Sequence, residues 1–358
     1  MAKPEFTVSL AHDGPEPTPR EMAERLAQLT ADGTVEADYY GNGGAVAAFE
    51  ARIAAFLGQE RAVIFPTGTL ANLMGMRLLA GTAGGRVVVH RLSHLFNDSG
   101  ENLSLLGGFT MVPLDDRGPG YSAEALAAEI ARAADARVAT RIGCVAIESP
   151  ARRAYGARFP AADREAVIAL AREHGIPLFL DAARMPIEAA YADLAPEVLA
   201  APFDLVYLSL YKYLGAPFGC VLAGPRALLD EVYHDRRRFG GGLAQMWPAA
   251  VLAQYHLDGH MARWQAAIPV GEAVAAALAE ADGLAVERIP DGTNIFLLRR
   301  AGRPFDKARL DAEAAAAGLA LPAPAGDVLP LRVNETWTRL PAEEITARLL
   351  SVLATADG

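Results

Sequence analysis

The sequence contains very little lysine. Of its 33 basic residues only Lys3, Lys212 and Lys307 are lysines, and all the others are arginines. Lys212 comes just after the apolar run of residues 203–210, where a charge is costly to bury. Arginine cannot replace lysine where a desolvated amine must lose its proton and form a Schiff base with a carbonyl. Lys212 is therefore either such an amine or a lysine at a strand end whose ammonium reaches solvent.

Cysteine and long hydrophobic runs are also scarce. Cys144 and Cys220 each lie in an apolar stretch, which predicts two buried thiols, excludes a disulfide framework and favours a reducing cytoplasm. Charged residues interrupt every apolar stretch before about eighteen residues, which argues against a membrane span. Residues 1–6 lack a basic segment followed by an apolar core, so we expect no secretory signal there.

Positive charge is in deficit as well. The net charge of −10 gives no indication of a nucleic-acid groove or of an anionic membrane surface as a partner. A chain of 358 residues with 52% hydrophobic and 21% charged residues is typical of a soluble globular protein with a large core. We therefore expect a small-molecule substrate and a cytoplasmic location.

From about residue 45 the chain alternates between helical patterns and short, uniformly apolar strands. The expected strands are 61–65, 86–89, 109–113, 142–147, 177–180, 204–208 and 220–222, and the helices between them are 44–57, 70–79, 122–134 and 161–174. Such strands predict an α/β fold with a mainly parallel sheet covered on both faces. Ligands bind beyond the carboxyl ends of strands in such sheets.

The pattern changes near residue 240. One long helix is expected over about 244–281, although it contains Pro248 and Pro269. Strand, helix and strand patterns follow at 294–298, 306–317 and 328–333, with a closing helix. We therefore predict a large domain over residues 1–245, including an N-terminal segment, and a smaller C-terminal α+β domain over 246–358.

Asp181 ends a buried strand, and Lys212 follows further along the chain. A buried carboxylate needs a cationic partner, and a protonated pyridine nitrogen is one such partner. An enzyme that uses pyridoxal 5'-phosphate (PLP) needs both groups, because the lysine bonds the cofactor and the aspartate keeps its ring protonated. The structural alternative for Asp181 is a helix N-cap.

Small and hydroxyl residues suggest where a phosphate would bind. Thr67, Gly68 and Thr69 follow a strand and open a helix, and backbone N–H groups at a helix N-terminus favour anions. Ser209 is a second candidate phosphate ligand. His94 follows another strand, where an imidazole has the position to stack on a planar ring. Each feature also occurs for purely structural reasons, as a helix cap or a satisfied histidine.

Taken in order, these segments resemble the fold-type I PLP enzymes, specifically the threonine aldolase and aromatic amino acid β-eliminating lyase family. The similar segments run over nearly the whole chain: Tyr40-Gly41, Pro66-Thr-Gly-Thr-Leu-Ala-Asn72, Ser93-His94, Leu180-Asp-Ala-Ala-Arg184, Lys212-Tyr-Leu-Gly-Ala-Pro-Phe-Gly219, Thr293-Asn294-Ile295 and Arg332. The resemblance implies a three-layer large domain like that of aspartate aminotransferase.

The resemblance also implies roles for individual residues. Lys212 would bond PLP, Asp181 would face its ring nitrogen and His94 would stack on the ring and serve as a base. Arg184 and Arg332 would hold the substrate carboxylate. His12 and Tyr40 are further candidates for substrate contacts, and Arg184 is also placed near the cofactor. Active sites of this fold lie at subunit interfaces, which implies a homodimer or homotetramer, with Tyr39, Tyr40 or Arg238 reaching the neighbour.

Several positions depart from the family pattern. His12-Asp13-Gly14 stands in place of Ser-Asp-Thr, Glu148-Ser149-Pro150 in place of Glu-Asn-Thr, and Tyr211 in place of the serine before the lysine. A second family histidine has no counterpart, and Ala244 replaces an arginine for which Arg237 or Arg238 is a substitute. These differences leave the cofactor hypothesis in place and bear on the substituent at the substrate's β carbon.

The expected reaction is cleavage of a β-hydroxy-α-amino acid, of the threonine or allo-threonine type, to glycine and an aldehyde. The nearest alternative is a PLP-dependent β-eliminating lyase or an aminotransferase acting on another amino acid. A nicotinamide-dependent oxidoreductase is disfavoured because no Gly-x-Gly-x-x-Gly follows the first strand. A non-enzymatic protein is disfavoured because the Lys, Asp and Arg positions are filled. A zinc site at His90 and His94 lacks further ligands at suitable spacing.

Overall fold

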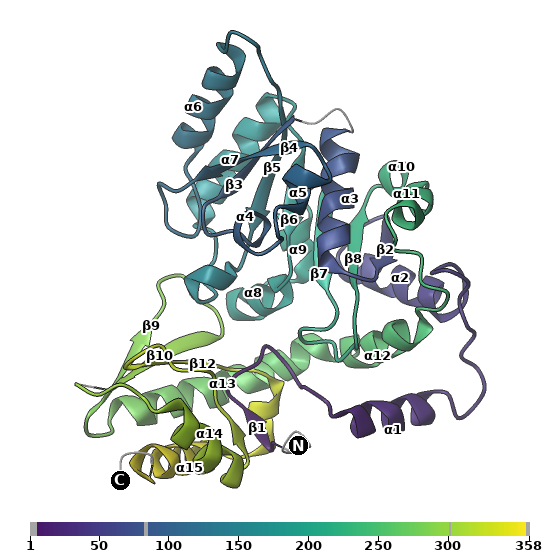
Figure 1. Cartoon of the computed structure of the whole chain (residues 1–358). Coiled ribbons are helices and arrows are strands. Elements are labelled where there is room, and N and C mark those ends of the chain that lie inside the picture. Colours follow the sequence, from purple (N-terminus) through teal and green to yellow (C-terminus); the bar gives the residue numbers. More distant parts are fainter. Residues whose placement is uncertain (1–5, 82–84, 301, 356–358) are drawn as a thin grey trace.

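The large sheet has seven strands and forms the centre of the molecule (Figure 1). The computed structural model describes residues 6–81, 85–300 and 302–355, so Lys3 and the expectation about residues 1–5 lie outside it. In spatial order the strands are β2 (Arg61–Phe65), β8 (Cys220–Gly224), β7 (Leu205–Ser209), β6 (Leu178–Asp181), β5 (Ile142–Glu148), β3 (Gly85–His90) and β4 (Phe109–Leu114).

The pairing in this sheet is mainly parallel, as predicted. Strands β7, β6, β5, β3 and β4 run parallel to their neighbours, and only β8 is antiparallel, inserted between β2 and β7. Each parallel pair needs a crossover connection, and the helical segments between the strands supply it. Since β2 and β7 both pair antiparallel with β8, the carboxyl ends of β2, β5, β6 and β7 lie at one edge.

Helices cover both faces of the sheet, which explains why its strands are apolar at successive positions. Val145 and Leu180 belong to the core on one face, whereas Ala146 and Phe179 belong to the core on the other. The first face is covered by α2 (Gly44–Phe56), α6 (Ala123–Ala134), α7 (Ala161–Glu173), α8 (Met185–Ala192), α9 (Pro196–Ala200) and α12 (Trp247–Leu257). The second face is covered by α3 (Gly68–Ala80), α4 (His94–Asn97), α5 (Asn102–Leu105), α10 (Arg226–Leu229) and α11 (Val232–Arg238).

The single helix predicted over residues 244–281 is wrong. The structure has two helices there, α12 and α13 (His260–Ala279), separated by Asp258 and Gly259. Gly259 has a φ of 67°, a left-handed backbone conformation that interrupts a right-handed helix. Pro269 lies inside α13 and does not interrupt it. The glycine, not either proline, ends the helical run.

The C-terminal region has its own core and a three-stranded antiparallel sheet. The sheet order is β12 (Val328–Arg332), β10 (Ile295–Arg300) and β9 (Leu284–Arg288), of which β9 was not predicted. Helices α13, α14 (Lys307–Ala316) and α15 (Ala342–Thr355) supply further core side chains, as do Val8 and Leu10 of the N-terminal segment. The predicted α+β character is confirmed. The domain boundary after residue 245 stays a prediction, although α12, which lies beyond it, packs in the core of the large sheet.

The N-terminal segment crosses between these two regions (Figure 1). Strand β1 (Val8–Ser9) pairs in parallel with β11 (Leu319–Ala320) of the C-terminal region. Residues 10–18 then lead to α1 (Pro19–Leu29), which packs beside α12 of the large region. Residues 10–14 are therefore held between the two regions.

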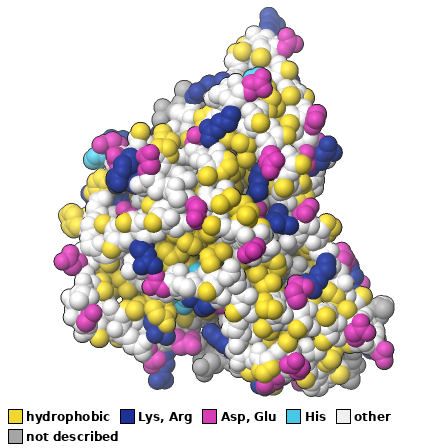
Figure 2. Space-filling view, turned by 180° about the vertical axis from the view of Figure 1, so that it is seen from behind, with side chains coloured by type: hydrophobic (Ala, Val, Ile, Leu, Met, Phe, Trp, Pro, Cys, Tyr) yellow, Lys and Arg dark blue, Asp and Glu magenta, His cyan; other side chains and the backbone are white. Residues whose placement is uncertain are grey.

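The surface carries charges of both signs. Figure 2 shows Lys and Arg side chains interspersed with Asp and Glu on the face seen from behind. Cys144 and Cys220 are buried and free, as predicted. Within the described ranges, no helix is both long and apolar enough to cross a membrane.

Candidate active site

Polar side chains gather at the carboxyl edge of the large sheet. Glu148 ends β5, Asp181 ends β6 and Ser209 ends β7, and these three strands are direct neighbours. Glu148 and Asp181 are paired across β5 and β6. Lys212 follows β7 by three residues and interacts electrostatically with Asp181. The structure therefore brings the predicted lysine and aspartate to the same place.

Lys212 has the surroundings of a reactive amine. Its side chain is half-buried, and burial together with the nearby Arg184 guanidinium lowers its pKa from 10.5 to about 8. Asp181 and Asp13 oppose this shift because they favour the ammonium. Lys307, by contrast, is exposed and forms an ion pair with Asp311. A much larger fraction of Lys212 is neutral near neutral pH than in an ordinary lysine, which favours a nucleophilic role over a solvated strand-end charge.

Asp181 is buried without a complete set of partners. Only 1% of the residue is exposed, and Oδ1 accepts a hydrogen bond of 3.2 Å from the backbone N–H of Ala183. Oδ2 is buried and has no hydrogen-bond partner among the described residues. The N-cap position of α8 is occupied by Arg184, so Asp181 is not the cap of that helix. A protonated ring nitrogen fits the unpaired oxygen, because a buried carboxylate is stable only when it is paired.

The turn at the start of α3 is shaped to admit an anion. Thr67 is the N-cap and its hydroxyl accepts from the Leu70 N–H at 3.3 Å, whereas the first amides of the helix have no intrahelical acceptor. A Cβ at Gly68 would come within 2.3 Å of the Tyr207 hydroxyl, so only glycine lets the Tyr207 side chain lie this close to the turn. The Ser209 hydroxyl is fully buried and has no partner among the described residues. These groups fit a phosphate.

His94 is fixed to the same edge by Glu148. The backbone N–H of His94 donates to Glu148 Oε2 at 2.5 Å, and the N–H of Arg152 donates to Oε1 at 3.0 Å. The His94 ring is partly exposed, with Nδ1 3.7 Å from Asp98 Oδ2. Burial and the neighbouring Asp181 raise the pKa of Glu148 to about 7. Glu148 is therefore a buried carboxyl that changes charge near neutral pH, beside the candidate base.

Arg184 and Arg332 also meet, and a third residue joins them. Arg184 Nε donates to Asp13 Oδ2 at 2.7 Å, and Arg332 Nε lies 4.0 Å from Asp13 Oδ1. Arg332 Nη1 donates to the Ala11 carbonyl at 2.7 Å. No role was predicted for Asp13, although its segment His12-Asp13-Gly14 was compared with the family pattern and His12 was predicted to contact the substrate. The signal that was available is the acidic residue itself, retained in a segment whose other two positions depart from the family pattern.

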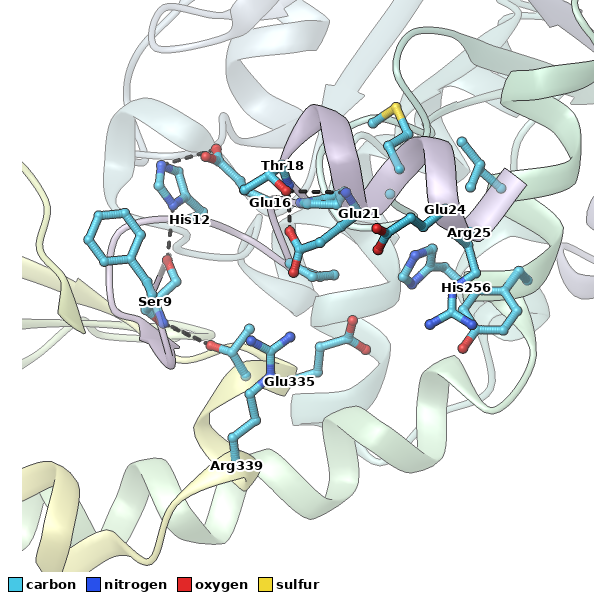
Figure 3. A pocket seen from close by; sticks show the side chains of 18 of the residues that line it. Ser9, His12, Glu16, Thr18, Glu21, Glu24, Arg25, His256, Glu335 and Arg339 are labelled. Atoms are coloured by element: carbon cyan, nitrogen blue, oxygen red, sulfur yellow. Dashed lines mark hydrogen bonds and ion pairs between the residues drawn. The ribbon is translucent and has the colours of Figure 1, made fainter. Parts of the chain in front are cut away.

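His12 and Tyr40 each have contacts outside the cluster of Lys212, Asp181 and the arginines. The His12 ring bonds Ser9 Oγ at 2.9 Å and Glu16 Oε1 at 3.0 Å (Figure 3). It lines a separate pocket of about 360 Å³ between the N-terminal segment, α1 and α12. The Tyr40 ring lies under the Arg237 guanidinium, 4.2 Å from centroid to Cζ. Their predicted contacts with substrate stay predictions.

No metal site accompanies these groups in the part of the chain that the structure describes, where no three His, Cys, Asp or Glu side chains are grouped as ligands.

Gly14 packs the N-terminal segment against the loop that carries Lys212. A Cβ on Gly14 would come within 2.6 Å of the Tyr213 Cα, so this segment lies directly against the residue that follows Lys212.

Comparisons with known proteins agree with this geometry. A family described as beta-eliminating lyase matches residues 11–300. The chain is 23% identical over 278 residues to low-specificity L-threonine aldolase 1 of Arabidopsis thaliana, covering 77% of each chain. A crystal structure of a putative L-allo-threonine aldolase from Listeria monocytogenes superimposes with a TM-score of 0.80 and 26% identity, over 98% of this chain and 97% of that one.

A more distant structure, described as SPT with PLP, superimposes with a TM-score of 0.69 at 15% identity, over 98% of this chain and 88% of that one, and so shows the shared fold. The matched region spans between 55% and 77% of the length of the first four curated relatives.

Proposed function

Because the chain belongs to the beta-eliminating lyase family, we propose that it cleaves a β-hydroxy-α-amino acid of the threonine or allo-threonine type to glycine and an aldehyde. The chain is a pyridoxal phosphate-dependent enzyme of the fold-type I group. The relatives named as threonine aldolases support the choice of substrate class. The lowered pKa of Lys212 beside the unpaired Asp181 carboxylate carries the cofactor chemistry of the proposal, and the choice of aldol cleavage is supported by the named relatives.

Four groups of this chain are suited to hold the cofactor. Lys212 has the amine that bonds its aldehyde, and Asp181 Oδ2 is the free acceptor for its ring N–H. The first amides of α3 after Thr67 and the buried Ser209 hydroxyl are donors for its phosphate. Bound PLP supplies an electron sink for the electrons of the bond that breaks at the substrate's Cα.

The arginines orient the amino acid. Arg184 and Arg332 present planar guanidinium groups, which recognise a carboxylate through two parallel hydrogen bonds. Fixing the carboxylate fixes which Cα bond stands across the plane of the cofactor ring, and only that bond breaks readily. Two points of attachment, at the amine and at the carboxylate, therefore select the bond that breaks.

His94 is the proposed base. Its backbone is held by Glu148, and its ring is partly exposed beside Asp98, so it can take a proton from a hydroxyl on the substrate's β carbon directly or through one water. Loss of this proton lets the Cα–Cβ bond break, with an aldehyde as the leaving product. Glu148, with its pKa near 7, is placed to influence the charge around His94 at physiological pH.

Product analysis tests the proposal. Purified enzyme with PLP is incubated with threonine, allo-threonine and phenylserine, and in parallel with β-substituted derivatives of serine and cysteine. Glycine together with acetaldehyde or benzaldehyde is expected from the first set. Pyruvate and ammonia from the second set alone would overturn the aldol assignment while leaving the cofactor assignment in place.

A β-eliminating lyase is the second candidate, with an aminotransferase behind it. The description of the matching family favours elimination, and Glu148-Ser149-Pro150 departs from the family segment near the cofactor. Both candidates use the same lysine, aspartate and arginines. They differ in the bond that breaks: aldol cleavage breaks the Cα–Cβ bond, whereas β-elimination removes a substituent from the β carbon.

An assembly of at least two copies, a homodimer or homotetramer, is part of the proposal. Tyr39 is 73% exposed, and Thr67 and Thr69 at the candidate phosphate turn are exposed in the single chain. A neighbouring copy that covers these residues would complete the site. A cytoplasmic location is likewise proposed, in keeping with two free thiols.

A further inference from the structure

Asp13 stands where an incoming carboxylate is expected to bind. It is 8% exposed and is the only side chain in the described part of the chain that bonds the Arg184 guanidinium. Its second oxygen, Oδ1, faces Arg332 at 4.0 Å and is buried without a hydrogen-bond partner among the described residues. The two arginines proposed to hold the substrate thus already share one carboxylate of the protein.

The backbone holds Asp13 firmly in this position. Before it, the Leu10 carbonyl accepts from the Arg332 N–H at 2.8 Å, and the Ala11 carbonyl accepts from Arg332 Nη1. Next to it, Asn334 Nδ2 donates to the His12 carbonyl at 2.8 Å. After it, Gly14 lies against Tyr213. Asp13 therefore cannot move aside without breaking contacts with both regions of the molecule.

Asp13 also offsets positive charge. The charged groups of the site comprise four cations and three carboxyl groups: Arg152, Arg184, Lys212, Arg332, Asp13, Glu148 and Asp181. Without Asp13 the excess of positive charge in this partly buried site is larger. Paired guanidinium groups with excess positive charge bind phosphate and sulfate as readily as carboxylates.

We propose that Asp13 is a specificity-determining residue, an internal counter-ion that keeps inorganic oxyanions out of the Arg184–Arg332 pair. An amino acid would still bind because its amine is held at the same time by the cofactor aldehyde, where it takes the place of Lys212, whereas sulfate or phosphate has only the arginines to bind. Although burial opposes it, the two arginines hold the pKa of Asp13 below its ordinary value, so the carboxylate is charged throughout the physiological range. This inference rests on the proposed role of Arg184 and Arg332.

The test measures competition between sulfate and glycine in the PLP-loaded enzyme. Glycine is titrated while the visible absorbance of the cofactor is followed, at several sulfate concentrations and constant ionic strength. In D13N the inhibition constant for sulfate is expected to fall at least about tenfold relative to the wild type, because one nearby negative charge is removed. Glycine affinity without sulfate is not the readout, because lost alignment and added positive charge act on it in opposite directions.

D230N is the matched control. Asp230 also pairs with an arginine, Arg61, at 2.8 Å, but this pair lies at the opposite edge of the sheet. Its sulfate constant is expected to equal that of the wild type.

Two results would overturn the inference: equal sulfate constants in D13N and wild type, or loss of folded protein in both D13N and the smaller neutral variant D13S, which would make the role structural. Glycine that leaves the wild-type spectrum unchanged would instead overturn the amino acid site, and absence of aldehyde from threonine would overturn only the aldol reaction.

Discussion

The two halves of the candidate site are built in different ways. The cofactor half consists of Thr67, Asp181, Ser209 and Lys212, which lie at or just beyond the carboxyl ends of strands of one sheet. The carboxylate half consists of Asp13, Arg184 and Arg332, which come from the N-terminal segment, the large region and the C-terminal region. The first half is positioned by the sheet. The second depends on how the regions pack, so the proposed roles in cofactor binding and in substrate selection depend on different contacts.

This difference explains why the N-terminal segment, which lies between the two regions, accepts so many hydrogen bonds from the C-terminal region. Asn334 Nδ2 donates to the carbonyls of Ser9 and His12, both at 2.8 Å, and the Trp337 indole N–H donates to the Ser9 carbonyl at 2.9 Å. A segment without regular secondary structure has few backbone partners of its own, so side chains of the C-terminal region satisfy it. The position of Asp13 therefore depends on residues more than 300 positions away.

The largest effect is expected in the cofactor half. K212A removes the amine that bonds PLP, and K212R cannot replace it, because a guanidinium does not lose its proton. Both are expected to lose the visible absorbance of the bound cofactor and to lower turnover on the order of 10³-fold or more. K307A is the matched control and should leave spectrum and turnover unchanged. An unaltered spectrum in K212A would end the assignment of this half.

D181N is expected to act next most strongly. It removes the negative charge that stabilises a protonated ring nitrogen, so turnover should fall about 10²-fold or more with a smaller change in KM. It also removes the like charge beside Glu148, so the pKa of Glu148 should fall below about 7. Steady-state kinetics and a pH profile measure both. A change in KM alone would show that Asp181 acts on substrate binding and does not belong to the cofactor half.

R184Q and R332Q should change KM more than they change turnover, the reverse of what is expected for D181N. Each removes charge-assisted hydrogen bonds to the substrate carboxylate, so KM should rise about 10- to 100-fold. Ethylamine, which has an amine and no carboxylate, is the matched probe, and its effect on the cofactor spectrum should be unchanged. Equal losses for the amino acid and for ethylamine would show that the arginines support the cofactor half instead.

The pH dependence of PLP uptake is a further test of the cofactor half. Only the neutral amine reacts, so the rate at which cofactor-free protein takes up PLP should rise with pH through about 8, the pKa of Lys212, and level off above it. Replacing Asp181 by Asn removes a charge that favours the ammonium, so D181N should shift this midpoint to lower pH. A midpoint near the ordinary value of 10.5 would contradict the depressed pKa.

The smallest effect is expected from N334A. It removes the donor to the Ser9 and His12 carbonyls and should lower the free energy of unfolding by about 1–3 kcal/mol in denaturant titrations. KM should rise more than turnover falls, because Asp13 is no longer held. N42A, which removes an exposed asparagine, is the control and should change stability by less than about 0.5 kcal/mol. A loss of cofactor in N334A would contradict the separation of the two halves.

The strand ends of the large sheet could be predicted from the sequence because their pattern is local. A uniformly apolar run followed by Asp181 or Ser209 identifies the last residue of a strand, and parallel pairing brings such residues to one edge. Strand β9 and the break between α12 and α13 were missed. Strand β9 is largely exposed, so its sequence shows little of the apolar pattern that identifies a strand. Gly259 was no stronger indication of a helix break than the nearby prolines.

By itself, the sequence determined which chemistry was available: one lysine after a buried strand, an aspartate at a strand end and arginines in place of other cations. The tertiary structure alone decided that Asp13 is shared by Arg184 and Arg332, and that His12 lines another pocket together with residues of α12 and of the C-terminal region. The reason is physical. Local pattern fixes whether a residue ends a strand, whereas the pairing of side chains from distant segments depends on how the two regions pack.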